Sequence, residues 1–388
     1  MTAPVQRRRM RLITAGFFSL SGLIAASWSS RIPDVQQKLG LDDAAWGTVL
    51  VSLPIGLVTG ILLSGWLVER YGANRIMPVS CIICALLLCL LALAPSRPAL
   101  MLVLFFVGLA RTILNISINT RSVEVQQLYD RPIVSVFHGI WSIACLAAAG
   151  IGQVMIILHW LPATHFFVVA AFCIAAAILL GNRSGGKASA TGEKRPFLVK
   201  PDAYLLKLGL VAFCALLTES AMFDWSISYF EKLVKADKSL VTAGLSSFIV
   251  TMSLGRLGGD WLIKRYGELN LLVANGMLMC LGLLLAAAFP FVLPAALGFM
   301  LAGLGDSIII PIAYTMAARS KRMKPSYAIA CVSLLGTSGF IISPLIMGSL
   351  SEVLGMRWAF AFVGMAAILI AVMAFKIRKQ SESLRPAA

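Results

Sequence analysis

The sequence has few charged residues. Only 13% of its 388 residues are Asp, Glu, Lys or Arg, whereas 59% are hydrophobic, and the mean hydropathy is +0.88. A soluble chain of this length needs far more polar surface to cover its core. The scarcity of charge therefore excludes an ordinary soluble domain and indicates an integral membrane protein.

Signatures of catalysis and of metal binding are missing as well. The three histidines are scattered, which argues against a structural zinc site. All eight cysteines lie in apolar stretches, where we expect them to pack as small core residues rather than to form disulfides. No Walker-type phosphate-binding loop occurs, and no nucleophile–base arrangement is recognisable. We therefore expect no enzyme, no cofactor, no metal and no transport driven directly by ATP.

Lys and Arg outnumber Asp and Glu by 33 to 17, which gives a formal net charge of +16. Most of the basic residues gather in alternate loops and in the two tails, as the positive-inside rule describes. Arg7, Arg8, Arg9 and Arg11 precede a long apolar run, which predicts an uncleaved first helix. We expect a multi-pass protein of the bacterial inner membrane with both termini in the cytoplasm, embedded in lipid and without a nucleic-acid partner.

Apolar stretches of roughly 18 or more residues recur along the chain, and each can cross a bilayer core of about 30 Å. Because the backbone must satisfy its own hydrogen bonds in lipid, these stretches are predicted to be helices. The predicted fold class is an all-α membrane protein. Its twelve transmembrane helices are expected near 11–32, 45–68, 76–95, 99–122, 132–158, 162–182, 204–230, 240–263, 270–290, 294–316, 327–350 and 357–377.

A segment rich in Gly, Ser and Lys over residues 183–200 has the composition of a flexible linker. It separates six predicted spans from six. We expect an N-terminal six-helix bundle over 1–182, a cytoplasmic linker over 183–203 and a C-terminal six-helix bundle over 204–388.

An internal repeat links the two halves. Residues 66–72 read WLVERYG at the end of the second span, and residues 261–267 read WLIKRYG at the end of the eighth. A weaker match pairs Trp28 and its neighbouring serines with Trp225 in the seventh span. Parallel repeats of six helices around a site at the membrane midplane are typical of secondary transporters.

The first copy of the repeat has a specific resemblance. Gly65, Glu69, Arg70 and Gly72 resemble the loop signature of the major facilitator superfamily, with Glu69 in place of its usual aspartate. Further residues resemble the YbjJ-like, fucose-permease-like branch of that family. The resemblance implies two pseudo-symmetric six-helix bundles, a central cavity lined by spans one, four, seven and ten, alternating access and a functional monomer.

Six ionisable residues are candidates for positions at bilayer depth. Such residues cost about 2.5 kcal/mol or more at membrane depth, and they usually mark solute pathways or proton relays. They are Arg111, Glu219, Asp224, Arg256, Asp260 and Asp306.

Arg111 and Asp306 are separated by the same offset as the repeat, so they occupy equivalent places in the two halves. We expect them to face each other and, with Glu219, to bind solute and couple protons. The alternative is a permanent ion pair that only neutralises both charges.

Other residues could contact a polar solute. Asn115 and Asn119 share the helix face of Arg111, although hydrogen bonding between helices explains them equally well. Tyr314 shares the face of Asp306. Trp28 and Trp225 could stack on a sugar, but their positions near span ends favour a role as interfacial anchors.

Three residues are candidates for proton coupling. Glu219 lies deeper in the seventh span than Asp224, so it is the preferred carrier. Asp224 lies about 140° away from Glu219 on an ideal helix, so both reach one cavity only if the seventh span bends or unwinds. His138 is the third candidate, with a buried, hydrogen-bonded histidine as the alternative.

The remaining charges are interpreted as gate elements. Arg256 and Asp260 are four residues apart, so we expect them to pair within their own helix. Together with Arg265, Glu69 and Arg70, and with Gly65 and Gly72 of the signature, they would form the gate network.

The leading hypothesis for function is a secondary active transporter of a small polar solute, sugar or sugar-like, coupled to protons. Drug or metabolite efflux is the first alternative. Efflux antiporters of the family often carry a proline-containing motif in the fifth span, and residues 147–153 contain no proline. A transporter-like receptor is the third possibility.

Overall fold

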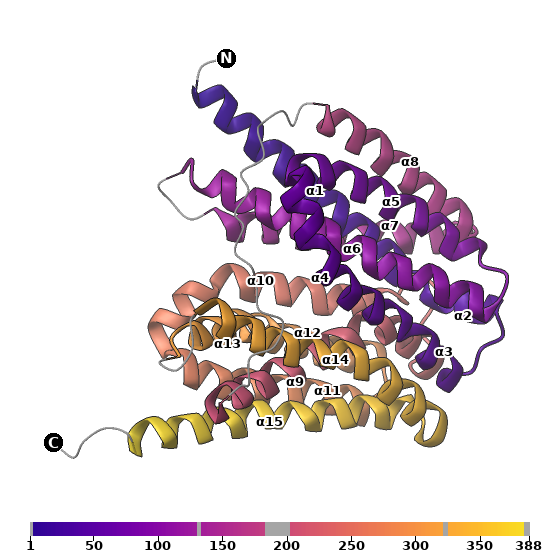
Figure 1. Ribbon diagram of the computed structural model, residues 1–388. Coiled ribbons are helices and arrows are strands. Elements are labelled where there is room, and N and C mark those ends of the chain that lie inside the picture. The colour runs from indigo at the N-terminus through magenta and orange to yellow at the C-terminus, as the bar shows by residue number, and fades with distance from the viewer. Residues whose placement is uncertain (1–2, 130–132, 183–201, 321–324, 384–388) are drawn as a thin grey trace. The chain divides into compact units, whose positions relative to one another are not determined.

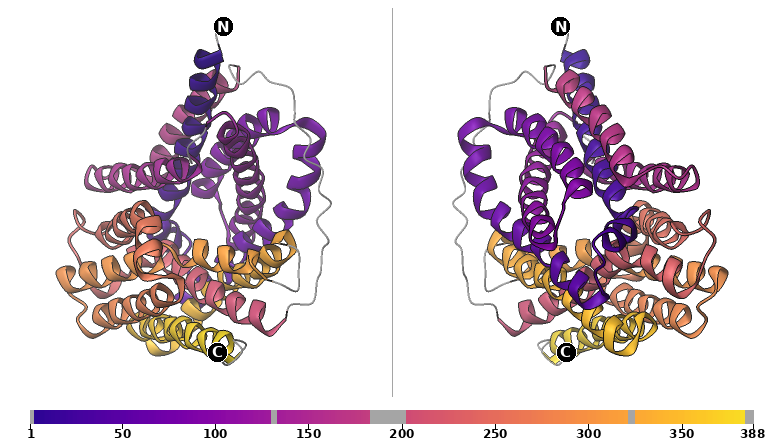
Figure 2. Two further views of the ribbon diagram at one scale, coloured as in Figure 1. Left: turned by 90° about the vertical axis from the view of Figure 1, so that its left-hand side faces the viewer. Right: turned by 90° about the vertical axis from the view of Figure 1, so that its right-hand side faces the viewer.

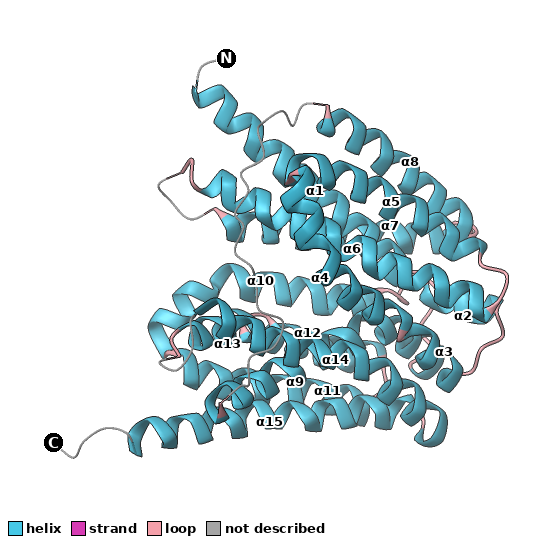
Figure 3. Ribbon diagram, in the orientation of Figure 1, coloured by secondary structure: helices cyan, strands magenta, loops and turns pink. Residues whose placement is uncertain are grey.

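The computed structural model describes residues 3–129, 133–182, 202–320 and 325–383. Almost all of these residues are helical, and no strand occurs among them (Figure 3). Of the predicted linker over 183–203, residues 183–201 lie outside the described part. The predicted all-α fold is confirmed.

Eleven helical stretches of the described chain are long and apolar enough to cross a membrane. The eighth predicted span is missing from that set because α10 carries Arg256, Asp260, Lys264 and Arg265. At 24 residues it is nevertheless about 36 Å long, which exceeds the bilayer core. Charge therefore lowers the hydropathy of this helix without shortening it.

The described helices fall into two compact units, coloured indigo to magenta and rose to yellow in Figure 1. Figure 2 shows the helices of each unit from two sides. The first unit contains α1 (Ala3–Ser29), α2 (Ile32–Lys38) and the end of α3 (Asp43–Leu50). It also contains the whole of α4 (Ser52–Tyr71), α5 (Ala73–Leu93), α6 (Arg97–Gln126), α7 (Val134–Ile157) and α8 (Pro162–Gly181).

The second unit contains the remaining helices together with Asp43–Gly47 at the start of α3. Within it, α9 packs against α14, and α11 packs against α12 and α15. The helices are α9 (Ala203–Ser228), the π-helical turn η1 (Tyr229–Leu233), α10 (Ala243–Tyr266), α11 (Glu268–Ala288), α12 (Val292–Asp306), α13 (Ile309–Ala318), α14 (Pro325–Leu354) and α15 (Met356–Ser383).

Glycine contacts hold one helix pair of each unit at close range. A Cβ at Gly108 of α6 would collide with the backbone oxygen of Leu53. In the second unit, a Cβ at Gly282 of α11 would collide with the backbone oxygen of Gly298 of α12. Small residues allow membrane helices to approach in this way, so van der Waals contact replaces the hydrophobic effect that lipid does not supply.

The sequence repeat is also a structural repeat. Gly72 ends α4 with φ 82°, and Gly267 ends α10 with φ 81°. Residues other than glycine have a strained backbone at such φ angles. Just before each glycine, a tryptophan and a tyrosine form an edge-to-face pair, with ring centroids 6.1 Å apart in the first copy and 6.3 Å in the second.

The tenth span is broken in the middle, between the end of α12 at Asp306 and the start of α13 at Ile309. Pro311 explains the break, because it has no N–H to donate to the carbonyl of Ser307 four residues earlier, and its ring crowds that carbonyl. The break leaves the Ser307 carbonyl available to a side chain, next to the buried Asp306.

Candidate functional site

A charged cluster lies inside the second unit, where α9, α10 and α12 each supply one residue. Arg256 Nη2 of α10 is 3.9 Å from Glu219 Oε2 of α9. Arg256 Nε donates to the carbonyl of Ser307 at 3.3 Å, and Asp306 interacts electrostatically with both Glu219 and Arg256. Three elements distant in sequence thus bring one guanidinium and two carboxylates together.

The expected ion pair between Arg256 and Asp260 is wrong. Asp260 is exposed, and no ion pair joins it to Arg256 among the described residues. Arg256 turns instead toward Glu219 and the unwound turn after α12. The sequence could not predict this pairing, because it depends on how α9, α10 and α12 pack. Only Pro311 indicated locally that the Ser307 carbonyl, next to Asp306, would need a hydrogen-bond donor from outside its own helix.

Asp306 is the most deeply buried acid of the cluster. Its exposed fraction is 1%, and neither carboxylate oxygen has a hydrogen-bond partner among the described residues. Buried charges normally require both an opposite charge and hydrogen bonds. One guanidinium is shared here by two acids, so the cluster has an excess of negative charge when both are ionised. A proton or another cation would balance it.

Tyr314 of α13 belongs to the same region. It is half-buried, hydrogen-bonds Ser333 of α14 and interacts electrostatically with Glu219. The structure therefore brings together Glu219, Asp306 and Tyr314 of the predicted site residues and adds Arg256, which the sequence had assigned to a gate.

Asp224 has a different environment. It accepts a hydrogen bond from Ser220 Oγ at 3.1 Å, one turn earlier in α9. The helix is regular as far as Ser228, and the π-helical turn begins only at Tyr229. The unwinding that would bring Asp224 onto the face of Glu219 is therefore absent.

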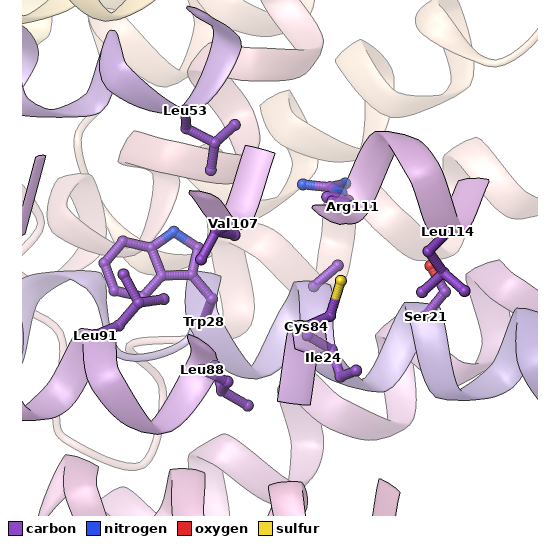
Figure 4. A pocket seen from close by; sticks show the side chains of 11 residues that line it. Ser21, Ile24, Trp28, Leu53, Cys84, Leu88, Leu91, Val107, Arg111 and Leu114 are labelled. Atoms are coloured by element: carbon purple, nitrogen blue, oxygen red, sulfur yellow. The ribbon is translucent and has the colours of Figure 1, made fainter. Parts of the chain in front are cut away.

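Arg111 lies in a pocket inside the first unit, lined by α1, α4, α5 and α6 (Figure 4). Its volume is about 30 Å³. The sulfur of Cys84 points toward Arg111, and the indole of Trp28 forms part of the wall. Within this unit, no described residue forms an ion pair with Arg111. Asp306 belongs to the second unit, so its pairing with Arg111 stays a prediction.

The two asparagines on α6 bond to each other. Asn119 Nδ2 donates to the carbonyl of Asn115 at 2.9 Å and to its side-chain oxygen. The expected alternative, hydrogen bonds between helices, is not what these atoms form. The side-chain N–H groups of Asn115 have no hydrogen-bond partner among the described residues, and the role of the pair in solute binding stays a prediction.

The interpretation of the two tryptophans as interfacial anchors is wrong. Trp28 is 5% exposed and Trp225 is fully buried, so neither ring reaches a membrane surface. Trp28 packs against Phe166 in the first unit and lines the Arg111 pocket.

The histidines also differ from expectation. His138 is exposed and meets the ring of Phe18 edge-on at 5.3 Å, so it is not a buried core histidine. The fully buried histidine is His165 of α8, which the sequence did not single out. Its Nδ1 accepts from Arg31 Nε at 3.3 Å, and Arg31 also donates to the carbonyl of Trp160 at 2.9 Å.

The predicted gate residues lie at helix ends. Glu69, Arg70 and Arg265 are exposed, and the guanidinium of Arg70 lies 5.5 Å from the ring of Trp66. Gly72 makes the turn described above, whereas a Cβ at Gly65 would meet nothing within 4 Å. Their role in gating stays a prediction.

Comparison with known proteins gives a consistent result. The family model described as Major Facilitator Superfamily matches residues 12–324 and 277–388. The chain is 27% identical over 357 residues to an uncharacterized MFS-type transporter of Yersinia pestis, covering 92% of this chain and 93% of that protein. It is 29% identical over 367 residues to the uncharacterized transporter y4wD of Sinorhizobium fredii, covering 94% and 97%.

Solved structures share the fold at low identity. A bacterial homolog of the human lysosomal transporter Spinster, in an inward-facing and occupied conformation, matches with a TM-score of 0.78 at 15% identity, over 97% of each chain. The nucleoside transporter NupG matches with a TM-score of 0.75 at 18% identity, over 98% of this chain and all of that one.

Proposed function

Because the chain belongs to the Major Facilitator Superfamily, a family of membrane transporters, we propose that it is a secondary active transporter that couples movement of a small polar solute to protons. The solute would cross by alternating access of the two helical units. NupG, by its name, carries nucleosides, and a relative in Staphylococcus epidermidis is named a probable nitrate transporter. These names support a polar solute without identifying it.

The observation that carries the proposal is the pair of acids that share Arg256. Asp306 is 1% exposed with both oxygens unpaired among the described residues, and Glu219 lies 3.9 Å from the guanidinium. Ionisable groups held inside a membrane bundle are commonly part of proton relays. A proton on one carboxylate would leave Arg256 to pair with the other, so protonation would change which helices the arginine joins.

This switch would connect the proton to movement. Arg256 is anchored to the Ser307 carbonyl at the break between α12 and α13, and broken helices form the solute and ion sites of many transporters. If Arg256 alternates between Glu219 of α9 and Asp306 of α12, the contact between these two helices changes with each proton bound. Solute binding near Tyr314 would then be coupled to the same exchange.

Uptake into proteoliposomes tests the proposal. The panel comprises hexoses, sugar acids, nucleosides and nitrate, each with and without an inward pH gradient. Wild-type protein should accumulate at least one of them only with the gradient. Glu219→Gln and Asp306→Asn should lose accumulation but keep exchange of internal for external solute, because exchange needs no net proton movement.

Glu268→Gln is the matched control, since Glu268 at the start of α11 pairs with Arg319 just after α13 and lies outside the cluster. It should accumulate solute like the wild type. Proton coupling would be overturned if the wild type accumulated solute equally with and without the pH gradient. It would also be overturned if Glu219→Gln and Asp306→Asn both accumulated solute like the wild type.

A further inference from the structure

The pocket around Arg111 combines a single charge with an apolar wall. Arg111 is the one charged residue among the eleven that line it, and Ser21, Trp28 and Cys84 supply the polar hydrogens. Most of the remaining lining residues are aliphatic, from Ile24 of α1 to Leu114 of α6. Ligand pockets of this type place one anchoring charge among hydrophobic contacts.

The size of the pocket limits the group that can enter it. About 30 Å³ holds roughly two water molecules. That is enough for the two oxygen atoms of a carboxylate beside the guanidinium, so the rest of a solute would lie along the Trp28 and aliphatic wall. A sugar would need a hydrogen-bond partner for each hydroxyl, and the aliphatic wall provides none.

The charge of Arg111 determines the sign of that group. Within the first unit, no described acid pairs with the guanidinium, and an arginine inside a membrane bundle without a counter-charge is costly. A planar oxyanion suits a guanidinium best, because it accepts two parallel N–H bonds.

We infer that this pocket, which we call the Arg111 subsite, takes the anionic group of a solute whose neighbouring part is apolar, as in an aromatic or aliphatic monocarboxylate. The inference rests on the proposed function, in that it names the class of solute the transporter carries. It replaces the sugar expected from the sequence with an amphipathic monoanion. The carboxylate would sit between Arg111 and Cys84, and the apolar body would contact Trp28 and the aliphatic wall.

The experiment is equilibrium binding to the purified full-length protein at constant pH, so it requires neither transport nor a gradient. Phenylacetate and hexanoate are compared with phenylacetamide and hexanamide, which have nearly the same shape without the charge, and with galactose. Tryptophan fluorescence reports binding, because Trp28 lines the pocket. The wild type should bind each carboxylate at least 10-fold more tightly than its amide and should bind galactose more weakly than either.

Three variants sharpen the test. Arg111→Gln should abolish the preference for the carboxylate, and Arg111→Lys should keep part of it, since a lysine retains the charge but loses the two-pronged geometry. Arg97→Gln is the matched control, because Arg97 is exposed at the start of the same helix, fourteen residues or about 21 Å away. Cys84→Leu fills the pocket while keeping Arg111, and it should weaken both carboxylates even if Arg111→Gln does not fold.

Failure of this inference can be told from failure of the proposed function. Equal binding of carboxylates and amides, no binding of any carboxylate, or a preference that survives Arg111→Gln would overturn the Arg111 subsite and leave proton coupling standing. Asp306→Asn should retain the carboxylate preference. If the wild type showed no pH-driven accumulation but still bound carboxylates more tightly than amides, proton coupling alone would be overturned.

Discussion

The two units share their glycine turns and close helix contacts, but they differ in the charged residues inside their helices. Both turn at a glycine with positive φ after a tryptophan–tyrosine pair, and both hold one helix pair together through glycine. In the first unit, however, Arg111 lines a pocket with no acid beside it, whereas the second unit gathers Glu219 and Asp306 around Arg256. A duplicated framework has kept its turns and close contacts while its buried charges diverged.

The difference separates two uses of an arginine. Arg256 has its counter-charges within its own unit, so it contributes to the stability of that unit as well as to any switch. Arg111 has none there and is available to a ligand. Substitutions that treat the two arginines alike should therefore give different results.

The largest effect is expected from Arg256→Gln. It leaves Glu219 and Asp306 together without a cation, so pH-driven accumulation should fall about 100-fold, and unfolding in detergent should become easier by about 2 kcal/mol, less than for a fully buried pair because Arg256 is partly exposed. Arg111→Gln should not lower the unfolding free energy, because it removes a guanidinium that has no counter-charge within its unit.

Thermal unfolding of both variants measures the contrast. Adding Glu219→Gln to Arg256→Gln should recover part of the lost stability, because it removes one of the uncompensated acids. Equal destabilisation by the two arginine variants would mean that Arg111 is also paired for structural reasons.

The glycine contacts test whether the shared framework is equally tight in both units. Gly108→Ala and Gly282→Ala place a Cβ against backbone atoms of the neighbouring helix, which cannot move away as a side chain can. Each should destabilise the protein by about 1–3 kcal/mol in thermal unfolding. Gly150→Ala is the matched control, because a Cβ there meets nothing within 4 Å and should gain up to about 1 kcal/mol from helix propensity. A large loss at only one of the two close contacts would show that the units are not equally packed.

Sequence reasoning predicted the framework better than the site, and the reasons are physical. Helices in lipid are predictable from composition and length, and the matching turns of the two units are predictable from the repeat at residues 66–72 and 261–267. The partner of Arg256 depends on which faces of three distant helices meet. Spacing along α10 suggested Asp260, and packing selected Glu219. The burial of Trp28 likewise depends on neighbours that its position near a span end does not reveal.

The broken tenth span gives a prediction of intermediate size. Pro311→Ala supplies the missing N–H, so the carbonyl of Ser307 gains a partner within the helix and competes with Arg256 for it. Accumulation driven by the pH gradient should fall about 10-fold, while thermal stability stays equal or rises. Transport at the wild-type rate would show that the unwound turn has no part in coupling. The corresponding helix of the first unit, α6, is unbroken, so no matching proline effect is expected there.

The smallest effect concerns the turns that the two units share. Gly72→Ala and Gly267→Ala each force a residue with a Cβ into φ near 80°. At Gly267 no atom lies within 4 Å of that Cβ, so only the backbone strain adds to the cost there. Each should therefore lower the free energy of unfolding by about 1 kcal/mol, near the lower end of the range for such backbone strain. Gly65→Ala, in the same signature but within a regular helix with open space at its Cβ, should not destabilise. Because both turns have nearly the same φ, their two values should agree. A difference larger than about 0.5 kcal/mol would mean that the two copies of the repeat, although alike in sequence and backbone, contribute differently to the free energy of unfolding.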